Sequence, residues 1–285
     1  YEDTVFQSEG NDYATEVSLA YITLRYRVPY ASPSVEFLLP HRTINFIYYM
    51  VNHPDLRLYN LSGIKYVVHP VGRGVAEESA EEMGIHEVDR TPFATIRENP
   101  GAYPRAFVVR NVVMAKPARK LHETYINGKL VRREMVMNEA VIFDRMLAQD
   151  TDLKAIAVIE EPLGEAPFAR PIVGQRSPAS APQPASTAAS AEIMRYEPQK
   201  VDVQVRTQSA GFLVLTDTWY PGWQATVNGS PAPIYRTDYL FRGVAVPAGD
   251  SIVRFEFRPL SFFLGLWISV LSFLASLIWA FRRWP

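Results

Sequence analysis

The stretch 217–229, "DTWYPGWQATVNG", places an aromatic turn before a short strand and ends at a hairpin signal. Pro221 and Gly222 suit the two central positions of a type II turn, in which glycine supplies a positive φ. Asn228 and Gly229 are typical of the two-residue type I′ turn that joins antiparallel strands. This stretch therefore predicts two turns of an antiparallel β-structure.

The aromatic residues around the Pro-Gly turn have different expected roles. From Trp223 the strand alternates, so this indole shares a face with Ala225 and Val227, and we expect it to pack in a core. Trp219 and Tyr220 precede the turn and lack this periodicity. They either pack as well or lie at a rim, where a flat ring could stack on the C–H face of a sugar.

Strand patterns continue on both sides of the turn. Four segments read as short strands separated by turn residues: "KVDVQVRT" (200–207), "GFLVLTD" (211–217), "LFRGVAV" (240–246) and "SIVRFEF" (251–257). With the strand from Trp223 they make five, which predicts an antiparallel β-sandwich over residues 192–258.

The C-terminal segment 259–281, "PLSFFLGLWISVLSFLASLIWAF", contains no charged residue. A helix of this length spans about 30 Å, the thickness of a bilayer's hydrocarbon core. A buried helix of a soluble domain would normally have a polar face, which this segment lacks. We therefore expect a transmembrane helix and a lipid bilayer as partner. Arg282 and Arg283 favour a cytoplasmic C-terminus, with residues 1–258 outside the cytoplasm, although Arg258 flanks the other end.

The N-terminal part alternates helix and strand signals, which predicts a small α/β unit. The first expected elements are weak strands in 1–32, a helix over 34–51 interrupted near Pro40, and a short helix from 55 with a stop at Gly63, followed by a buried strand over 64–69. A solvated helix over 77–84 and strands over 93–98 and 106–115 come next. The last are a helix over 138–149 capped by Asn138 and a strand over 154–160. The tract 174–191 is rich in Pro, Ala and Ser and reads as a linker or long loop.

The fold class expected from these patterns is α+β: a small α/β unit, an antiparallel β-sandwich and one transmembrane helix. The expected division is an extracytoplasmic α/β domain (1–173), a linker or loop (174–191), a β-sandwich domain (192–258), a transmembrane helix (259–281) and a cytoplasmic tail (282–285).

A second candidate site lies in "YRTDYLFR", 235–242. Tyr235, Arg236, Asp238, Tyr239 and Arg242 could line a polar and aromatic pocket for a saccharide or phosphate, since an arginine can bind an anion through two N–H groups. The alternative is an ordinary Arg–Asp pair on a solvated loop.

Composition excludes several classes of function. The chain has no cysteine, a net charge of −1, and five histidines without metal-ligand spacing. We therefore expect no metal, no cofactor and no nucleic-acid partner. The glutamates of "EESAEE" read as a solvated face, and no nucleophile or phosphate-loop motif occurs.

The segment "LVLTDTWYPGWQATVNGSPAPIYRTDYLFRGVAVPAG" (213–249) closely resembles the C-terminal signature of the YfhO-like family of bacterial multi-spanning membrane proteins. Further matches follow the family's order: "LSGIKYVV" (61–68), "ENPGAYPRAFVV" (98–109), "YEPQKVDVQV" (196–205) and "PLSFFLGLWIS" (259–269). The resemblance implies a parent similar to GT-C glycosyltransferases, which use a polyprenyl-phosphate sugar donor on the outer face. It implies catalytic acidic residues among upstream membrane helices, so no catalytic residue is assigned in this chain.

Two functions follow as hypotheses. The resemblance implies an accessory, acceptor-side region of a membrane glycosyltransferase, with a lipid-linked sugar or a cell-envelope glycan as partner. The alternative is a single-span, membrane-anchored module that binds or scaffolds in the envelope without enzymatic activity.

Overall fold

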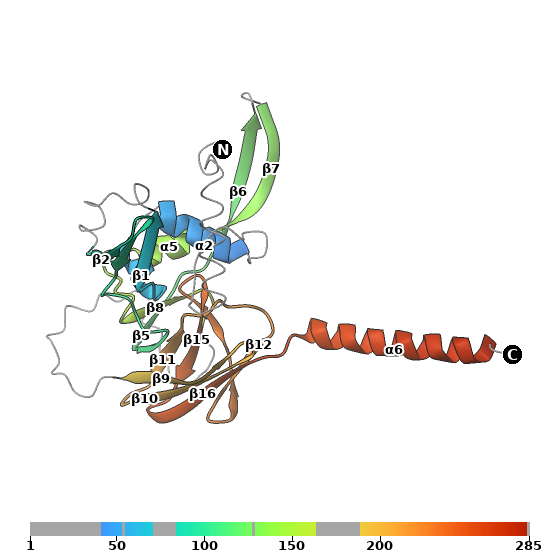
Figure 1. The fold of residues 1–285 in the computed structure, drawn as a ribbon. Coiled ribbons are helices and arrows are strands. Elements are labelled where there is room, and N and C mark those ends of the chain that lie inside the picture. Colours follow the sequence, from blue (N-terminus) through green and yellow to red (C-terminus); the bar gives the residue numbers. More distant parts are fainter. Residues whose placement is uncertain (1–40, 53–54, 71–83, 127–128, 164–188, 284–285) are drawn as a thin grey trace. The chain divides into compact units, whose positions relative to one another are not determined.

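The computed structural model describes residues 41–52, 55–70, 84–126, 129–163 and 189–283 (Figure 1). The chain divides into two compact units, Tyr1–Pro54 and Asp55–Pro285. The first unit contributes helix α2 (His41–Asn52), which begins directly after Pro40. Its residues Phe46 and Met50 are buried and lie four positions apart, hence on one helix face. The strands expected in 1–32 and the helix expected before His41 lie outside the described residues.

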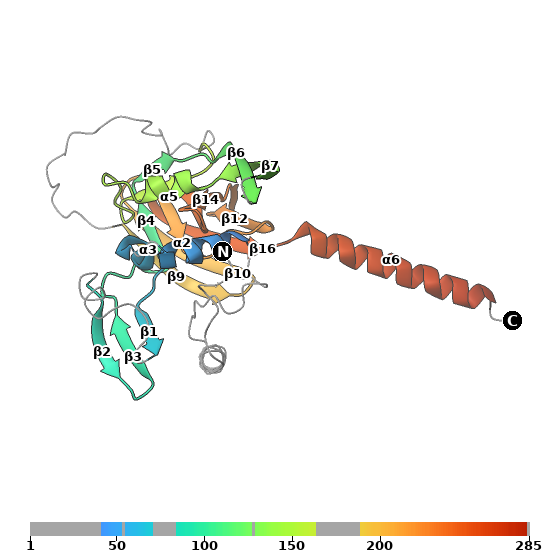
Figure 2. The same ribbon diagram turned by 90° about the horizontal axis from the view of Figure 1, so that it is seen from above.

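The second unit contains two β-sheets that pack face to face (Figures 1 and 2). The first has the antiparallel order β13-β12-β16-β10-β9, built from β9 (Ser190–Glu197), β10 (Lys200–Thr207), β12 (Trp223–Val227), β13 (Ser230–Ala232) and β16 (Gly249–Phe257). The second has the order β4-β11-β15-β14-β8-β5, built from β4 (Ala106–Val109), β5 (Asn111–Met114), β8 (Ile156–Ile159), β11 (Gly211–Leu215), β14 (Tyr235–Thr237) and β15 (Phe241–Val246). β5 and β8 pair in parallel.

One buried apolar cluster fills the space between these sheets. Val203 of β10 and Phe255 of β16 meet Leu213 and Leu215 of β11 and Val244 of β15. Alternate positions of each strand face this core, as the period-two pattern predicted. The α+β fold class with a β-sandwich and a C-terminal apolar helix is confirmed.

The sandwich extends beyond the segment 192–258 that the sequence delimited. Strands β4, β5 and β8 precede the tract 174–191, yet they belong to the same sheet as β11, β14 and β15. β11 is a continuous apolar run because both of its faces are covered. Leu213 faces the core between the sheets, and Phe212 and Val214 pack with Val109 and Ala157 on the other side.

A smaller antiparallel sheet has the order β1-β3-β2, formed by β1 (Tyr66–Pro70), β2 (His86–Arg90) and β3 (Ala94–Glu98) (Figure 2). Helix α3 (Leu56–Leu61) precedes it, and Gly63 follows the helix with a φ of 67°, as its stop position requires. The expectation of a buried strand is wrong, because Tyr66 and Val68 of β1 are both exposed. β2 was not predicted, and 77–83 of the expected helix lies outside the described residues.

The sequence patterns missed a long hairpin and misplaced the start of a short helix. β6 (Ala118–Ile126) and β7 (Lys129–Asn138) pair along their length and end at helix α5 (Ala140–Met146). The expected cap at Asn138 is wrong: this residue still pairs with Ala118 in the ladder, and the N-cap is Glu139, which makes no side-chain capping bond.

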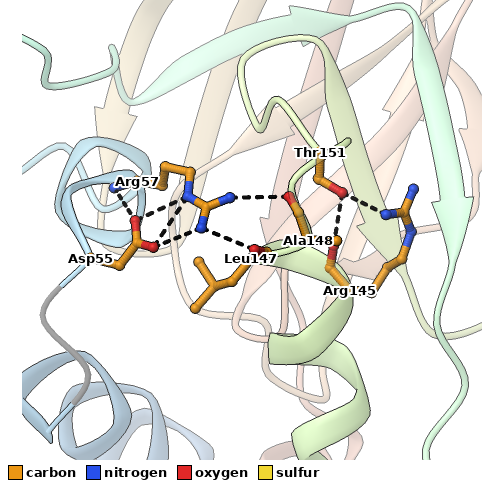
Figure 3. A network of polar contacts seen from close by, with 6 residues as sticks. All are labelled: Asp55, Arg57, Arg145, Leu147, Ala148 and Thr151. Atoms are coloured by element: carbon orange, nitrogen blue, oxygen red, sulfur yellow. Dashed lines mark hydrogen bonds and ion pairs between the residues drawn. The ribbon is translucent and has the colours of Figure 1, made fainter.

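The other end of α5 is held by an arginine from α3 (Figure 3). Arg57 donates to the carbonyl oxygens of Leu147 (3.0 Å) and Ala148 (3.1 Å), groups that a helix end leaves without partners. Asp55 accepts from the same guanidinium (2.7 Å) and also caps α3 through the backbone N–H of Arg57 (2.9 Å). This hydrogen-bonded arginine lowers the pKa of Asp55 below its ordinary value.

Helix α6 (Leu260–Arg283) follows β16. Its segment Leu260–Trp279 is long and apolar enough to cross a membrane, and none of this segment is buried within the chain. Exposed apolar side chains along its length, among them Phe262, Ile268 and Phe273, fit a lipid environment and do not fit the core helix of a soluble domain.

Candidate functional site

The aromatic turn between β11 and β12 has the geometry that its sequence predicts. The N–H of Trp223 donates to the carbonyl of Tyr220 (3.4 Å), which closes a four-residue turn around Pro221 and Gly222. Gly222 has a φ of 108°, a region that favours glycine.

The next turn is the two-residue hairpin between β12 and β13. Asn228 (φ 52°) and Gly229 (φ 83°) join the paired residues Val227 and Ser230. The side-chain oxygen of Asn228 accepts from the N–H of Ile252 (2.8 Å), so this asparagine also ties the hairpin to β16.

The aromatic turn is hydrogen-bonded to the residue segment that leads into the apolar helix. The N–H of Arg258, two residues before α6, donates to the carbonyl of Gly222 (2.7 Å). The ring of Phe257 lies 5.4 Å from the Trp223 ring and 6.4 Å from the Tyr220 ring, centroid to centroid. A Cβ on Gly222 would lie 3.0 Å from both Phe257 and the backbone of Pro259. The turn therefore fixes where the chain leaves the sandwich.

This contact predicts the effect of Gly222→Ala. We expect the free energy of unfolding to fall by about 1–3 kcal/mol, because the new methyl group meets Phe257 and Pro259 in a backbone conformation that alanine avoids. Gly229→Ala is the matched control, since Gly229 also has a positive φ but nothing lies within 4 Å of its Cβ. Denaturant unfolding in detergent micelles measures both, and equal losses would contradict a role of the contact.

Two arginines of the neighbouring hairpin stack on the two tryptophans of the turn. Arg236 of β14 and Arg242 of β15 are directly opposite in register, so their side chains leave the same face of the sheet. The guanidinium carbon of Arg236 lies 4.1 Å from the centre of the Trp219 ring, and that of Arg242 lies 3.8 Å from the Trp223 ring. We call these four residues the arginine–tryptophan cluster.

An aspartate from the start of the turn organises one side of this cluster. Asp217 accepts hydrogen bonds from Arg242 (2.7 Å), Arg105 (2.9 Å) and the hydroxyl of Tyr196 (3.0 Å). Arg105 also lies over the Tyr196 ring, 5.2 Å from its centre. Asp217 is thus the shared acceptor of two cations and a phenol.

The other side of the cluster has a looser ion pair. Arg236 Nη1 lies 3.3 Å from Glu160 Oε2, at the end of β8. The side chain of Arg236 is 28% exposed, whereas that of Arg242 is 2% exposed. The cluster therefore has a deep arginine and an accessible one.

Several N–H groups of these arginines are buried without an acceptor among the described residues: Nε of Arg236, and Nε and Nη1 of Arg242. Burial lowers the pKa of Arg242 to about 10, which still leaves it charged at neutral pH. Buried cationic donors without acceptors are costly and therefore call for an explanation.

The other predicted site residues have different surroundings. Tyr235 is buried beside Phe212, in the apolar cluster on the outer face of the second sheet. Tyr239 donates its hydroxyl to Glu139 (2.6 Å) and stacks on Phe143. Tyr220 is half exposed at the turn. The segment 235–242 is thus a buried hairpin that divides its side chains between two faces, and neither a single pocket nor a solvated loop.

Asp238 lies in the bend of this hairpin and is fully buried. It bonds Val158 twice: its N–H donates to the carbonyl (2.7 Å), and its Oδ1 accepts from the N–H (2.7 Å). Its partner is therefore a strand backbone, while the arginines pair with Asp217 and Glu160.

Sequence reasoning missed the two acids that pair with the arginines of the cluster and the further cation, Arg105, that shares one of them. Asp217, Glu160 and Arg105 lie on three segments far apart in the chain, and none belongs to a recognisable motif. The only available signal was the position of Asp217 at the start of the aromatic stretch. Within the described ranges, no group of three or more His, Asp or Glu side chains could hold a metal ion.

The aromatic turn of the β-sandwich is hydrogen-bonded to the chain just before a helix of membrane-spanning length, an arrangement that suits a membrane-anchored protein. Residues 183–269 match the family model of the bacterial membrane protein YfhO. This region, which runs from the sandwich into α6, is similar to the YfhO membrane proteins, and the match together with the apolar helix supports a membrane location for the protein. The comparison with curated proteins gave no match, and neither did that with solved structures.

Proposed function

We propose that residues 1–258 form the extracytoplasmic, acceptor-side region of a multi-spanning membrane glycosyltransferase that uses a polyprenyl-phosphate-linked sugar, with the catalytic residues upstream of this chain. The observation that supports this function is the YfhO match, because it includes both the sandwich and the start of the apolar helix. The carbonyl of Gly222 bonded to Arg258 makes these two parts one structural piece.

The proposed arrangement follows the sequence boundaries. Residues 1–173 contribute the α/β part together with sandwich strands β4, β5 and β8, 174–191 a linker or loop, 192–258 the remaining sandwich strands, 259–281 the membrane span and 282–285 a cytoplasmic tail. The shared six-stranded sheet implies that the first and third parts act together. Arg282 and Arg283 support the cytoplasmic placement of the tail.

The proposed binding residues are those accessible at the aromatic turn, namely Trp219, Tyr220 and Arg236. Tyr220 offers a half-exposed ring, and Trp219 and Arg236 form a partly exposed stacked pair. An aromatic face and a planar cation beside a membrane helix suit a sugar linked through phosphate to a lipid. Tyr235, Asp238 and Tyr239 would support this surface from within, and Arg242, which is 2% exposed, is the deepest of the candidate binding residues.

The alternative function is a single-span envelope module that binds or scaffolds without chemistry. The segment Leu260–Trp279 of α6 is long and apolar enough to cross a membrane and would anchor such a module. The intact mass of the native protein extracted from its membrane separates the two functions. A mass far above the 32.3 kDa of this chain supports the glycosyltransferase, and a mass near that value supports the module.

A transfer assay tests the residue assignment. In membranes containing the native protein and a polyprenyl-phosphate sugar, we expect Arg236→Gln to lower sugar transfer about tenfold, since a charged hydrogen-bond donor to the donor's phosphate is lost. Arg254→Gln is the control, because Arg254 forms a similar ion pair with Asp202 (2.8 Å) but is exposed on β16. Equal activities of the two variants, or an unfolded Arg236 variant, would contradict the assignment.

A further inference from the structure

We propose that the arginine–tryptophan cluster binds the phosphate group of a membrane lipid, through the unpaired N–H groups of Arg236 and Arg242. This inference deepens the proposed function and rests on it in one respect: the sandwich must lie at the membrane face where a lipid-linked donor presents its phosphate.

The first argument is the missing acceptor. Nε of Arg236 and both Nε and Nη1 of Arg242 are shielded from solvent and have no acceptor among the described residues. Arg236 and Arg242 are register partners, so their guanidinium groups extend from neighbouring points of one sheet face. A phosphate has several acceptor oxygens, which suits donors from two adjacent arginines better than a single carboxylate does.

The second argument is the charge balance. Arg105, Arg236 and Arg242 converge on two carboxylates, those of Asp217 and Glu160. Three cations therefore face two anions; Arg105 and Arg236 are partly exposed, and Arg242 is shielded from solvent. Beside the shielded Arg242 an anion is attracted more strongly than in water.

The third argument is that the stacked rings hold the donors in place. The guanidinium carbon of Arg242 lies over the rings of Trp223 (3.8 Å) and Phe255 (5.3 Å), and that of Arg236 lies over the Trp219 ring. A guanidinium stacked in this way keeps its N–H groups in the plane of the fork, pointing away from the ring faces. Little side-chain entropy is then lost when an anion binds.

The fourth argument is the route to the lipid. Arg236 is partly exposed, so an anion can approach from its side, while the unpaired N–H groups of Arg242 are shielded and would be reached after local rearrangement of the side chains around them. The same turn that places Trp219 and Trp223 bonds Arg258 just before the apolar helix. Tyr220, half exposed beside Phe257, suits the headgroup level, where tyrosine is enriched. A phosphate at this level belongs to a lipid.

Lipid binding is tested with the whole chain in nanodiscs of zwitterionic phospholipid. The probe is a polyprenyl monophosphate, and the matched probe is the corresponding polyprenol, which lacks the phosphate. Retained lipid is counted by native mass spectrometry, and tryptophan fluorescence reports occupancy because Trp219 and Trp223 contact the binding arginines. No sugar or acceptor is present, so the outcome is independent of transfer activity.

We expect the monophosphate to bind at least tenfold more tightly than the polyprenol. Arg236→Gln should weaken its binding about tenfold, which corresponds to about 1.4 kcal/mol, and Arg236→Lys should weaken it less because the charge remains. Arg254→Gln, on an exposed ion pair, should bind like the native protein. Circular dichroism verifies that each variant is folded.

Three results would overturn the proposal: equal binding of monophosphate and polyprenol, equal effects of the Arg236 and Arg254 variants, or displacement of the lipid by inorganic phosphate at matching concentration. The last would indicate a site for soluble phosphate. Lipid binding in a protein without sugar transfer would support this site and reject the glycosyltransferase function alone.

Discussion

Asp217→Ala is expected to lower the free energy of unfolding by about 3–5 kcal/mol. The Asp217 carboxylate is 11% exposed and accepts from Arg242, Arg105 and Tyr196. Its removal leaves the guanidinium of Arg242, which is 2% exposed, without the ion-pair partner that it has among the described residues. A buried cation that loses its partner retains the full cost of desolvation, and this is why the expected loss is large.

The matched control for this prediction is Asp202→Ala. Asp202 pairs with Arg254 at 2.8 Å, a distance close to that of the Asp217–Arg242 pair, but Arg254 is exposed. We expect a much smaller loss, because solvent screens the exposed pair. Denaturant unfolding in detergent micelles compares the two. Similar losses would show that Asp217 does not hold the cluster together.

A double-variant cycle separates the pair from its surroundings. Asp217→Leu combined with Arg242→Leu should cost less than the sum of the single substitutions, since the double variant leaves neither charge of this pair without its partner. Additive losses would mean that the two side chains contribute independently, and the cluster would then depend on packing around Trp223.

Asp238→Asn is expected to remove a pH dependence from the stability of the protein. Asp238 is fully buried, its Oδ1 accepts from Val158, and no described residue bonds its Oδ2. Burial raises the pKa of Asp238 to about 7, from an ordinary value of 3.8. The folded protein therefore holds this proton more tightly than the unfolded chain does.

The sign of the effect follows from that difference. Between about pH 4 and pH 7 the folded state binds more protons at Asp238, so its contribution to the free energy of unfolding falls as the pH rises. Above about pH 7 both states are ionised and the contribution no longer changes. Asparagine keeps the acceptor for Val158 and has no charge. The stability of the variant relative to the native protein should thus rise by about 2–4 kcal/mol from pH 4 to pH 7.

Unfolding curves recorded at several pH values check this prediction. Carboxylates such as Asp55, whose pKa is lowered by Arg57, act in the opposite direction at more acidic pH, so the difference between variant and native protein is the quantity to follow. Asp250→Asn, at an exposed position of β16, is the control and should change in parallel with the native protein. A constant difference between Asp238→Asn and the native protein would contradict the prediction.

Local patterns were sufficient for the turns and for most of the sandwich strands. The turn at Gly222 and the hairpin at Asn228 depend on backbone conformations that few residues adopt, so their residue types identify them. The apolar helix was also recognisable, because a bilayer requires a long uncharged segment. The hairpin of β6 and β7 was not recognised.

The bend between β14 and β15 is a feature that local sequence patterns did not predict. Asp238 and Tyr239 both have a positive φ, a conformation that neither residue type signals strongly. This bend brings Arg236 opposite Arg242, although the sequence around it left open a polar and aromatic pocket or a solvated loop. The N–H and the side-chain oxygen Oδ1 of Asp238 both bond the backbone of Val158, which lies eighty positions away along the chain. No local pattern contains that partner.

The sequence by itself determined the β-sandwich strands, the aromatic turn and the apolar helix, since each depends on residues close together in the chain. Only the tertiary structure decided that β4, β5 and β8 complete the sandwich, and that Asp217 and Glu160 are the partners of Arg242 and Arg236. Strand pairing across long stretches of chain depends on the fit of whole sheets. Charged residues that come together only through such pairing have no fixed spacing in the sequence, so no motif identifies them.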